Sequence, residues 1–239
     1  MIYSVVLNPC LDRSIIVDRI ELNEVTRASS VQLDWGGKGN NVGRALKILG
    51  VPCVIMGFTG GSTGEVMEKE LQAQGLTTNF IKISGETRTN YVFNEIRGDN
   101  YLKVNEPGPA ITKTEQDAFL REMQKVNKPG DIWVFCGRLP LGISDDFYEI
   151  CIREIQKGGG RAFLDTSGEA LKAGCHALPF LVKPNLTELE ELVGKPLLSR
   201  PEKIEAIKDL IRLGIKMVVV TDGENEITFA DQKEIIHIK

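Results

Sequence analysis

Short apolar runs recur along this sequence, and each is rich in strand-forming residues and stops at or beside Gly, Pro, Asn or Asp. Six runs share this form: IYSVVLN, VPCVIMGF, DIWVFCG, RAFLD, PFLVKPN and KMVVVTDG. We interpret these runs as buried strands, as expected in a parallel sheet.

Between these runs, the apolar residues follow helical spacing. In NVGRALKILG they recur at i, i+3, i+4 and i+7 from Val42 to Leu49, and Gly50 stands where a C′ residue belongs. The segments TGEVMEKELQAQG and SDDFYEICIREIQKGGG are alike, and TELEELVG is expected to begin at Thr187 as N-cap. Strands alternating with amphipathic helices predict an α/β fold with a doubly wound, mostly parallel sheet.

Two segments, residues 12–35 and 88–106, instead contain stretches that alternate apolar and polar residues with a period of two. The second resembles a hairpin that turns at residues 98–100. We expect the two segments to pair into a small separate sheet that forms a lid over one edge of the main sheet. The whole chain, residues 1–239, is predicted to be a single domain.

The composition narrows the possible partners and compartments. The net charge of −4 over 239 residues gives no electrostatic reason to expect nucleic acid or an anionic membrane. No run approaches the ~18 apolar residues of a membrane helix, and we find no signal peptide. The five cysteines are scattered without a CxxC pair, which argues for reduced thiols in a cytoplasmic protein. Two histidines without flanking carboxylate motifs argue against a zinc site or a Ser-His-Asp mechanism.

A glycine-rich stretch, WGGKGNNVG, precedes one of the expected helices. It is not a Walker A loop, because Gly39 rather than Ser or Thr follows Lys38. It is not a dinucleotide fingerprint either, because Val42 stands where the third glycine belongs. Its amides, the helix N-terminus and the Lys38 ammonium could converge on one anion. The alternative is a tight turn that uses glycine for steric reasons.

Two further polar residues lie near the expected lid and strand ends. Arg88, beside Thr87 and Asn90, suits forked recognition of a phosphate, although it could equally be a surface arginine. Asp12 follows the first strand at the sheet edge where ligands bind in open α/β sheets. Its carboxylate could accept hydrogen bonds from sugar hydroxyls, or it could form an Asx turn or a cap.

Six segments, taken in order, resemble the ribokinase superfamily, and most closely its branch of 1-phosphofructokinase and tagatose-6-phosphate kinase. They are LNPCLDR, GGKGNNVGRALKILG, GETRTNY, NEPGP, FLDTSGEAL and KPNLTELEEL, and the similarity runs from Met1 to about Phe229. The resemblance implies a Rossmann-like sheet with a β lid, and often homodimers that meet through the lids. It also implies a kinase that uses ATP and Mg²⁺ to phosphorylate fructose 1-phosphate, tagatose 6-phosphate or fructose 6-phosphate.

The resemblance also implies two sets of binding residues. Asp12 and Asn41 would face sugar hydroxyls, while Lys38, Arg88 and the loop amides would face the phosphate that the sugar already carries. The expected substrate set is Asp12, Gly37, Lys38, Gly39, Asn41, Arg88, Asn90 and Arg138. The expected nucleotide set is Lys183, Asn185, Glu188, Thr221 and Gly223.

Asn185 and Glu188 are three residues apart at the start of a predicted helix, so both lie on one face of its first turn. Glu188 would then hold a water-bound Mg²⁺ while Asn185 reaches a phosphate oxygen. A simple helix cap is the alternative.

The chain departs from the family pattern at two places within the matched segments. Arg138 replaces the usual serine of G-S-L-P, and it could add a phosphate contact or crowd the sugar. Asp222 and Glu226 stand where the family favours an apolar residue and a glycine, and their charges would repel a triphosphate.

The largest departure concerns the family's G-A-G-D segment, which carries its catalytic aspartate and should follow FADQKEIIHIK. No G-x-G-D occurs in the 239 residues. The resemblance therefore implies that the catalytic aspartate lies beyond Lys239, and we name no catalytic residue within the sequence.

The leading hypothesis is therefore a C-terminally truncated sugar-phosphate kinase with little or no activity. The alternative is a non-catalytic sugar-phosphate-binding or regulatory protein on the kinase scaffold. An adenosine- or ribose-type kinase fits less well, because its substrate carries no phosphate for Lys38 and Arg88 to bind.

Overall fold

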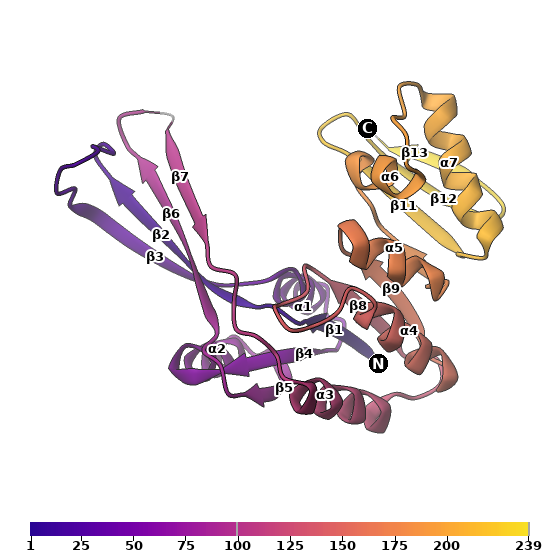
Figure 1. Cartoon of the computed structure of the whole chain (residues 1–239), viewed down its shortest axis with the longest axis horizontal. Coiled ribbons are helices and arrows are strands. Elements are labelled where there is room, and N and C mark those ends of the chain that lie inside the picture. Colours follow the sequence, from indigo (N-terminus) through magenta and orange to yellow (C-terminus); the bar gives the residue numbers. More distant parts are fainter. Residues whose placement is uncertain (99, 239) are drawn as a thin grey trace.

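The computed structural model describes residues 1–98 and 100–238, and these residues form two β-sheets and seven helices (Figure 1). The larger, which we call the main sheet, contains β1 (Ile2–Val6), β4 (Cys53–Gly60), β5 (Thr77–Ile83), β8 (Ile132–Cys136), β9 (Arg161–Asp165), β10 (Leu181–Val182), β11 (Met217–Asp222), β12 (Glu226–Asp231) and β13 (Ile235–Ile238). The other, which we call the small sheet, contains β2 (Cys10–Val17), β3 (Ala28–Gly36), β6 (Arg88–Glu95) and β7 (Tyr101–Asn105). The helices are α1 (Lys38–Ile48), α2 (Gly61–Ala73), α3 (Lys113–Val126), α4 (Phe147–Lys157), α5 (Gly168–His176), α6 (Leu186–Val193) and α7 (Arg200–Leu213).

The main sheet has the order β13-β12-β11-β10-β9-β8-β1-β4-β5. All neighbours from β5 to β11 are parallel, and only β12 and β13 run antiparallel at one edge. The small sheet has the order β3-β2-β6-β7 and rises beside the main sheet (Figure 1). The predicted α/β fold with a mostly parallel sheet and a small separate β-sheet is confirmed.

The hairpin predicted in the second alternating segment is present as the antiparallel pair β6–β7. Its predicted turn at residues 98–100 includes Asp99, which lies outside the described residues. Lys239 also lies outside the described residues. The expectation that the catalytic aspartate lies beyond Lys239 is not tested by the structure and stays a prediction. None of the described helices is long and apolar enough to cross a membrane.

The core lies between the main sheet and helices α3 to α7, and aromatic side chains dominate its centre. The rings of Tyr3 and Trp133 stack with centroids 4.1 Å apart, and Phe119, Phe147 and Tyr148 are buried close by. Each such side chain contributes about 1.5–3 kcal/mol by leaving water. The strand ends that carry the site therefore extend from a rigid platform.

Helix α1 packs against the opposite face of the main sheet. Tyr3 of β1 points into the core, whereas Ser4 points the other way and donates its hydroxyl hydrogen to the Gly39 carbonyl at 2.8 Å. A Cβ on Gly43 would lie 2.6 Å from Ile55 Cδ1, so only glycine allows the helix to approach the strands this closely.

The apolar stripe predicted to bury α1 is wrong in part. Leu49 is 73% exposed, and the buried residues of the helix are Gly39, Asn40 and Gly43. The physical reason is the close approach of the helix to the sheet, which leaves room for small residues only. Gly50 does take the C′ position, with φ of 70°.

The predicted N-cap of α6 is also wrong, because the helix begins after Asn185 and not after Thr187. The Asn185 side-chain oxygen accepts the backbone N–H of Glu188 at 2.8 Å. The Glu188 carboxylate accepts the backbone N–H of Asn185 at 2.8 Å. This reciprocal capping box satisfies two amides at once, which Thr187 could not do from inside the first turn.

Candidate functional site

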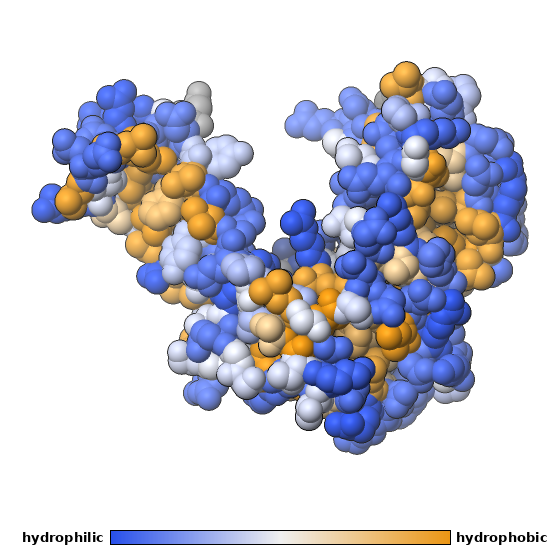
Figure 2. All heavy atoms as spheres, in the orientation of Figure 1, coloured by the Kyte–Doolittle hydropathy of each residue, from blue (hydrophilic) through white to orange (hydrophobic). Residues whose placement is uncertain are grey.

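Two adjoining cavities lie at the carboxyl ends of the central parallel strands. The larger cavity, about 580 Å³, lies between the main sheet and the small sheet, and the smaller, about 390 Å³, lies beside the start of α6. Lys38, Gly137 and Arg138 line both. Figure 2 shows the molecular surface hollowed between the small sheet and the rest of the protein, with hydrophilic residues around the hollow.

Residues from three neighbouring strands meet at this edge because the parallel register aligns the strand ends. Val6 of β1 pairs with Cys136 of β8, which pairs with Asp165 of β9. Seven of the eight predicted substrate residues line the larger cavity, and the exception is Gly39, which is buried against β1.

Asp12 is fixed on the small sheet beside the main sheet. Its Oδ1 accepts a hydrogen bond from Asn90 Nδ2 at 2.8 Å, and the two residues are direct partners in the β2–β6 register. Cys10 Sγ lies 3.3 Å from the same oxygen, and burial followed by the Asp12 charge raises the pKa of the Cys10 thiol to about 12. A Cβ on Gly36 would lie 2.0 Å from Asp12 Oδ2, so glycine is required there. Asp12 is thereby presented to the cavity in one orientation.

Helix α1 opens onto the larger cavity without a side-chain cap. Its N-cap Gly37 has φ of 116°, a left-handed conformation that favours glycine. Inside the first turn, Asn40 is buried and its Nδ2 donates to the carbonyl of Gly36 at 2.8 Å. The first amides of the helix therefore remain available to an anion, as helix N-termini commonly are.

The ammonium groups of two lysines meet at one carboxylate. Lys38 Nζ lies 2.9 Å from Asp165 Oδ1, and Lys183 Nζ lies 3.1 Å from Asp165 Oδ2. Lys38 therefore points toward the junction of the two cavities rather than into the larger one alone. Asp165 was not among the predicted site residues, although the strand-end rule that indicated Asp12 applies equally to the last residue of RAFLD.

Arg88 joins three segments at the base of the small sheet. It donates from Nη1 to the Glu106 carbonyl at 2.8 Å and from Nη2 to the Asn8 carbonyl at 3.3 Å. Its Nε is buried without a partner among the described residues. Sequence reasoning missed Asn8 and Glu106, although both stand inside the quoted segments LNPCLDR and NEPGP.

Two of the five predicted nucleotide residues line the smaller cavity, and the other three lie outside its lining. Asn185 and Glu188 line it, and Thr221 is bridged to Asn185 through the backbone. Lys183 does not line the smaller cavity, but it shares the Asp165 carboxylate with Lys38, which does. Gly223 lies at the tip of the β11–β12 turn, with φ of 53°. The structure thus brings four of the five close together and leaves Gly223 on the turn.

Asp222 and Glu226, the two carboxylates at which the chain departs from the family pattern, are paired with cations of α7. Lys203 Nζ lies 2.6 Å from Asp222 and 3.7 Å from Glu226, and Arg200 lies 3.5 Å from Glu226. The hydrogen bond from Lys203 lowers the pKa of Asp222. These cations offset the repulsion that we expected the two carboxylates to exert on a triphosphate.

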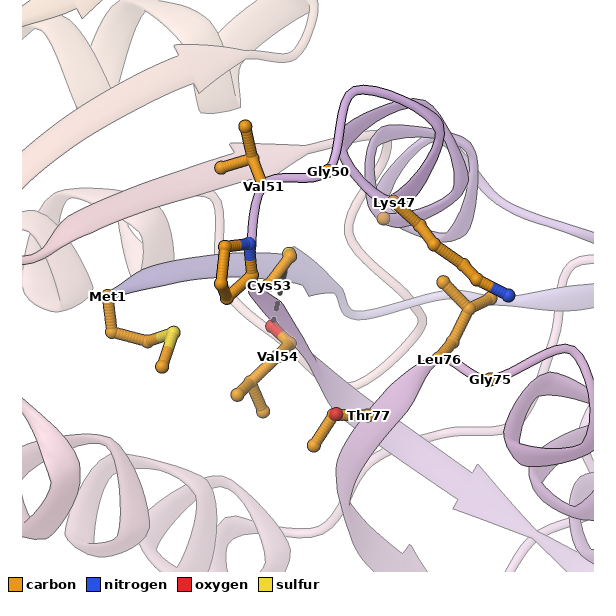
Figure 3. Close-up of a pocket in the computed structure, with 11 residues that line it drawn as sticks. Met1, Lys47, Gly50, Val51, Cys53, Val54, Gly75, Leu76 and Thr77 are labelled. Atoms are coloured by element: carbon orange, nitrogen blue, oxygen red, sulfur yellow. Dashed lines mark hydrogen bonds between the residues drawn. The ribbon is translucent and has the colours of Figure 1, made fainter.

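A third cavity, of about 360 Å³, opens at the opposite edge of the main sheet (Figure 3). It is lined mainly by apolar side chains and glycines, such as Val51, Leu76 and Gly75. Its one lysine, Lys47, donates to the carbonyl of Gln74. None of the predicted site residues lies there, so the carboxyl edge remains the candidate site.

Comparisons with known proteins agree on one family. Residues 4–239 match the family described as pfkB family carbohydrate kinase. The chain is 34% identical to 1-phosphofructokinase of Bacillus subtilis over 233 residues, which are 97% of this chain and 76% of that protein. It is 30% identical to 1-phosphofructokinase of Borreliella burgdorferi over 235 residues, or 98% of this chain and 75% of that one. It therefore spans about three quarters of these relatives.

Solved structures resemble the whole fold. Phosphofructokinase-2 from Escherichia coli in complex with fructose-6-phosphate is 29% identical and superposes with a TM-score of 0.94. The match covers 99% of this chain and 78% of that one. A putative phosphofructokinase from Staphylococcus aureus is 28% identical with a TM-score of 0.85, over 98% of this chain and 76% of that one.

Proposed function

We propose that this chain, which belongs to the pfkB family of carbohydrate kinases, binds a sugar phosphate in the larger cavity and ATP in the smaller one. The observation that carries the proposal is that Lys38, Gly137 and Arg138 line both cavities, so two ligands bound there would meet. Relatives named 1-phosphofructokinase and a solved neighbour bound to fructose-6-phosphate support a sugar-phosphate kinase. The candidate substrates are fructose 1-phosphate, tagatose 6-phosphate and fructose 6-phosphate.

The sugar hydroxyls are the proposed partners of Asp12 and Asn41. Asp12 Oδ2 accepts no hydrogen bond from the described residues, whereas Oδ1 is held by Asn90. A fixed carboxylate with one free oxygen can accept a hydrogen bond from a sugar hydroxyl without reorganising first. Asn90 acts here by orienting Asp12.

The phosphate that the sugar already carries is the proposed partner of Arg88, Lys38 and Arg138, together with the amides of Gly37 and Gly39. An uncapped helix N-terminus and these three cations, which all line the larger cavity, favour an anion there. Because Gly39 is buried against β1, its part would be limited to its backbone amide.

ATP phosphates are the proposed partners of Lys183, Asn185, Thr221 and Gly223, with Glu188 as the residue for Mg²⁺. Among the described residues, no group of three or more His, Cys, Asp or Glu side chains could hold a metal ion. Mg²⁺ is normally held by one or two carboxylates with waters and phosphate oxygens, so a single carboxylate fits. Glu188 uses Oε2 in the capping box, and its Oε1 accepts no hydrogen bond from the described residues. Bound Mg²⁺ would neutralise charge on the phosphates.

Phosphoryl transfer forms a bond from the sugar oxygen to phosphorus, breaks the bond to the leaving phosphate oxygen, and passes the hydroxyl proton to a base. We assign none of the residues up to Lys239 as that base, since they contain no G-x-G-D. A missing base typically costs ~10²–10⁴ in rate. We therefore propose that a polypeptide of these residues binds both ligands and turns over slowly.

We also propose that the small sheet, near residues 12–35 and 88–106, is the lid, and that its outer face meets a second copy. Strand register places one face toward the cavity and the other away from it. The outward face carries apolar side chains that are 47–56% exposed: Val31, Leu33, Leu102 and Val104. Patches of this kind mark contact surfaces. Leu102→Glu should shift a dimer to monomer in sedimentation, and an unchanged mass would contradict the proposal.

Calorimetry with sugar phosphates and with ATP, combined with a coupled ADP-release assay, tests the function. Tight binding of a sugar phosphate and of ATP with measurable ADP release supports a kinase. Tight binding of a sugar phosphate with no ADP release and no ATP binding favours the alternative, a non-catalytic sugar-phosphate-binding protein. Binding of neither ligand would refute both.

A further inference from the structure

The β11–β12 turn carries two carboxylates beside residues proposed to bind the nucleotide. Asp222 stands between Thr221 and Gly223 in the sequence, and it is the direct partner of Glu226 in the antiparallel register. The side chains of Asp222 and Glu226 are 19% and 14% exposed. Like charges opposite each other destabilise a strand pair, and here they would also repel the phosphates of a nucleotide.

Helix α7, which packs against β11, supplies the opposing charge (Figure 1). Lys203 Nζ lies 2.6 Å from Asp222 Oδ2 and 3.7 Å from Glu226 Oε1, and the lysine side chain is only 17% exposed. Arg200 and His237 approach the other Glu226 oxygen, at 3.5 and 3.8 Å. Among the described residues, Lys203 is the only cation paired with Asp222. Loss of Lys203 would therefore leave Asp222 without a counter-charge, whereas Glu226 would keep Arg200.

The position of these cations in α7 is unfavourable for the helix itself. Ser199 is the N-cap, so Arg200 and Lys203 both lie in the first turn. The helix dipole favours anions there and disfavours cations. The helix therefore gives no reason for the two cations, whereas the carboxylates of the turn do.

The backbone connects the turn to the smaller cavity. The N–H of Thr221 donates to the Pro184 carbonyl at 3.2 Å, and Thr221 is bridged to Asn185, which lines the cavity. The N–H of Asn225 donates to the Asp222 carbonyl at 2.9 Å and closes the turn. The charge of Asp222 therefore lies next to the groups that are proposed to bind phosphate.

We propose that Lys203 is a positioning residue of the nucleotide site, which pairs with Asp222 and Glu226 and so allows the phosphates of ATP to bind at the β11–β12 turn. The inference rests on the proposed function. Lys203 acts through the two carboxylates and not by touching the ligand. Its effect is therefore specific to a ligand that carries phosphates, and a nucleoside without phosphates should not respond to it.

Lys203→Met tests the proposal, because it removes the charge and keeps most of the side-chain stem. Calorimetry should show ATP bound about three- to tenfold more weakly, while the affinity for adenosine stays unchanged. Lys203→Arg keeps the charge and should bind ATP within about twofold of wild type. Arg212→Met is the matched control, because Arg212 also pairs with two carboxylates, Glu205 and Asp209, but lies in the last turn of α7. The control should bind both ligands as wild type does.

A second background separates charge from packing. In protein that carries Asp222→Asn and Glu226→Gln, adding Lys203→Met should change the affinity for ATP by less than about twofold, because no carboxylate is left for the lysine to neutralise. Thermal melts verify that each variant is folded at the temperature of the titration.

Three results would overturn the proposal: ATP binding by Lys203→Met within about twofold of wild type, an equal loss for adenosine, or a loss that persists in the background without the two carboxylates. Wild-type protein that does not bind ATP would instead refute the nucleotide part of the proposed function, before any variant is made.

Discussion

The ammonium of Lys38 lies 2.9 Å from Oδ1 of Asp165, although 127 residues separate them in the sequence. This contact ties the first turn of α1 to the end of β9 at the junction of the two cavities. The second carboxylate oxygen is taken by Lys183. One carboxylate therefore pairs with two ammonium groups, in the place where phosphate groups are proposed to bind.

Asp165→Asn should tighten the binding of small phosphate anions by roughly three- to tenfold. The substitution removes a competing negative charge and frees two ammonium groups, while the amide keeps the shape of the side chain. Titration with pyrophosphate and with Mg²⁺-free ADP measures the effect. Asp209→Asn, which removes a carboxylate paired with Arg212 on α7, is the control and should leave affinity unchanged. Weaker binding by Asp165→Asn would mean that Asp165 orients the lysines for the anion rather than competing with it.

The sequence predicts strand ends well and side-chain directions poorly. Asp12 was identified because buried parallel strands end at one edge of a sheet, and this rule needs only the position of each strand. The contact between Lys38 and Asp165 was not predicted, because its geometry depends on how α1 sits on the main sheet. That position depends on Gly43 fitting against Ile55, which no local pattern reveals.

The same limit explains the misjudged face of α1. Apolar spacing placed Leu49 on the apolar face of the helix, yet Leu49 is exposed, because periodicity records only which residues share a face. It does not record how close a helix lies to its sheet. At α6 the error was local, since Asn185 and Thr187 are both good N-caps and each has a glutamate three positions later, Glu188 and Glu190. In the structure the capping box forms between Asn185 and Glu188.

Lys203→Met should destabilise the protein in a manner that depends on pH. Lys203 lowers the pKa of Asp222, so this contribution to stability is present above the unfolded pKa of about 3.9 and is lost as pH falls through the lower folded pKa. We expect a melting temperature lower by roughly 2–4 °C at pH 7, the shift that about 1 kcal/mol produces in a domain of this size. Thermal melts between pH 3 and pH 7 should show the difference shrinking in acid. A difference that stays constant with pH would show that lost packing of the lysine stem, not charge, is responsible.

Arg88→Ala should weaken sugar-phosphate binding by roughly ten- to hundred-fold, with little effect on ATP, because hydrogen bonds to charged groups contribute about 1.5–3 kcal/mol. Arg88→Lys should not restore affinity. A lysine cannot hold the carbonyls of Glu106 and Asn8 and face a phosphate at the same time. Calorimetry with phosphorylated and unphosphorylated sugar separates the two roles. Equal affinity of the wild-type protein for both sugars would remove the basis for the assignment.

Glu188→Gln separates the metal role of this residue from its capping role. Glutamine also accepts a backbone N–H in a capping box, so α6 should remain intact and the melting temperature should change little. The lost charge should raise the Mg²⁺ concentration needed for nucleotide binding, by roughly three- to tenfold, because a carboxylate is the stronger ligand for this ion. Glu202→Gln is the matched control, since Glu202 forms the corresponding capping box with Ser199 at the start of α7. It should leave the Mg²⁺ titration unchanged. An unchanged titration for Glu188→Gln as well would assign Glu188 to the cap alone and would leave the phosphates to bring Mg²⁺ without this carboxylate.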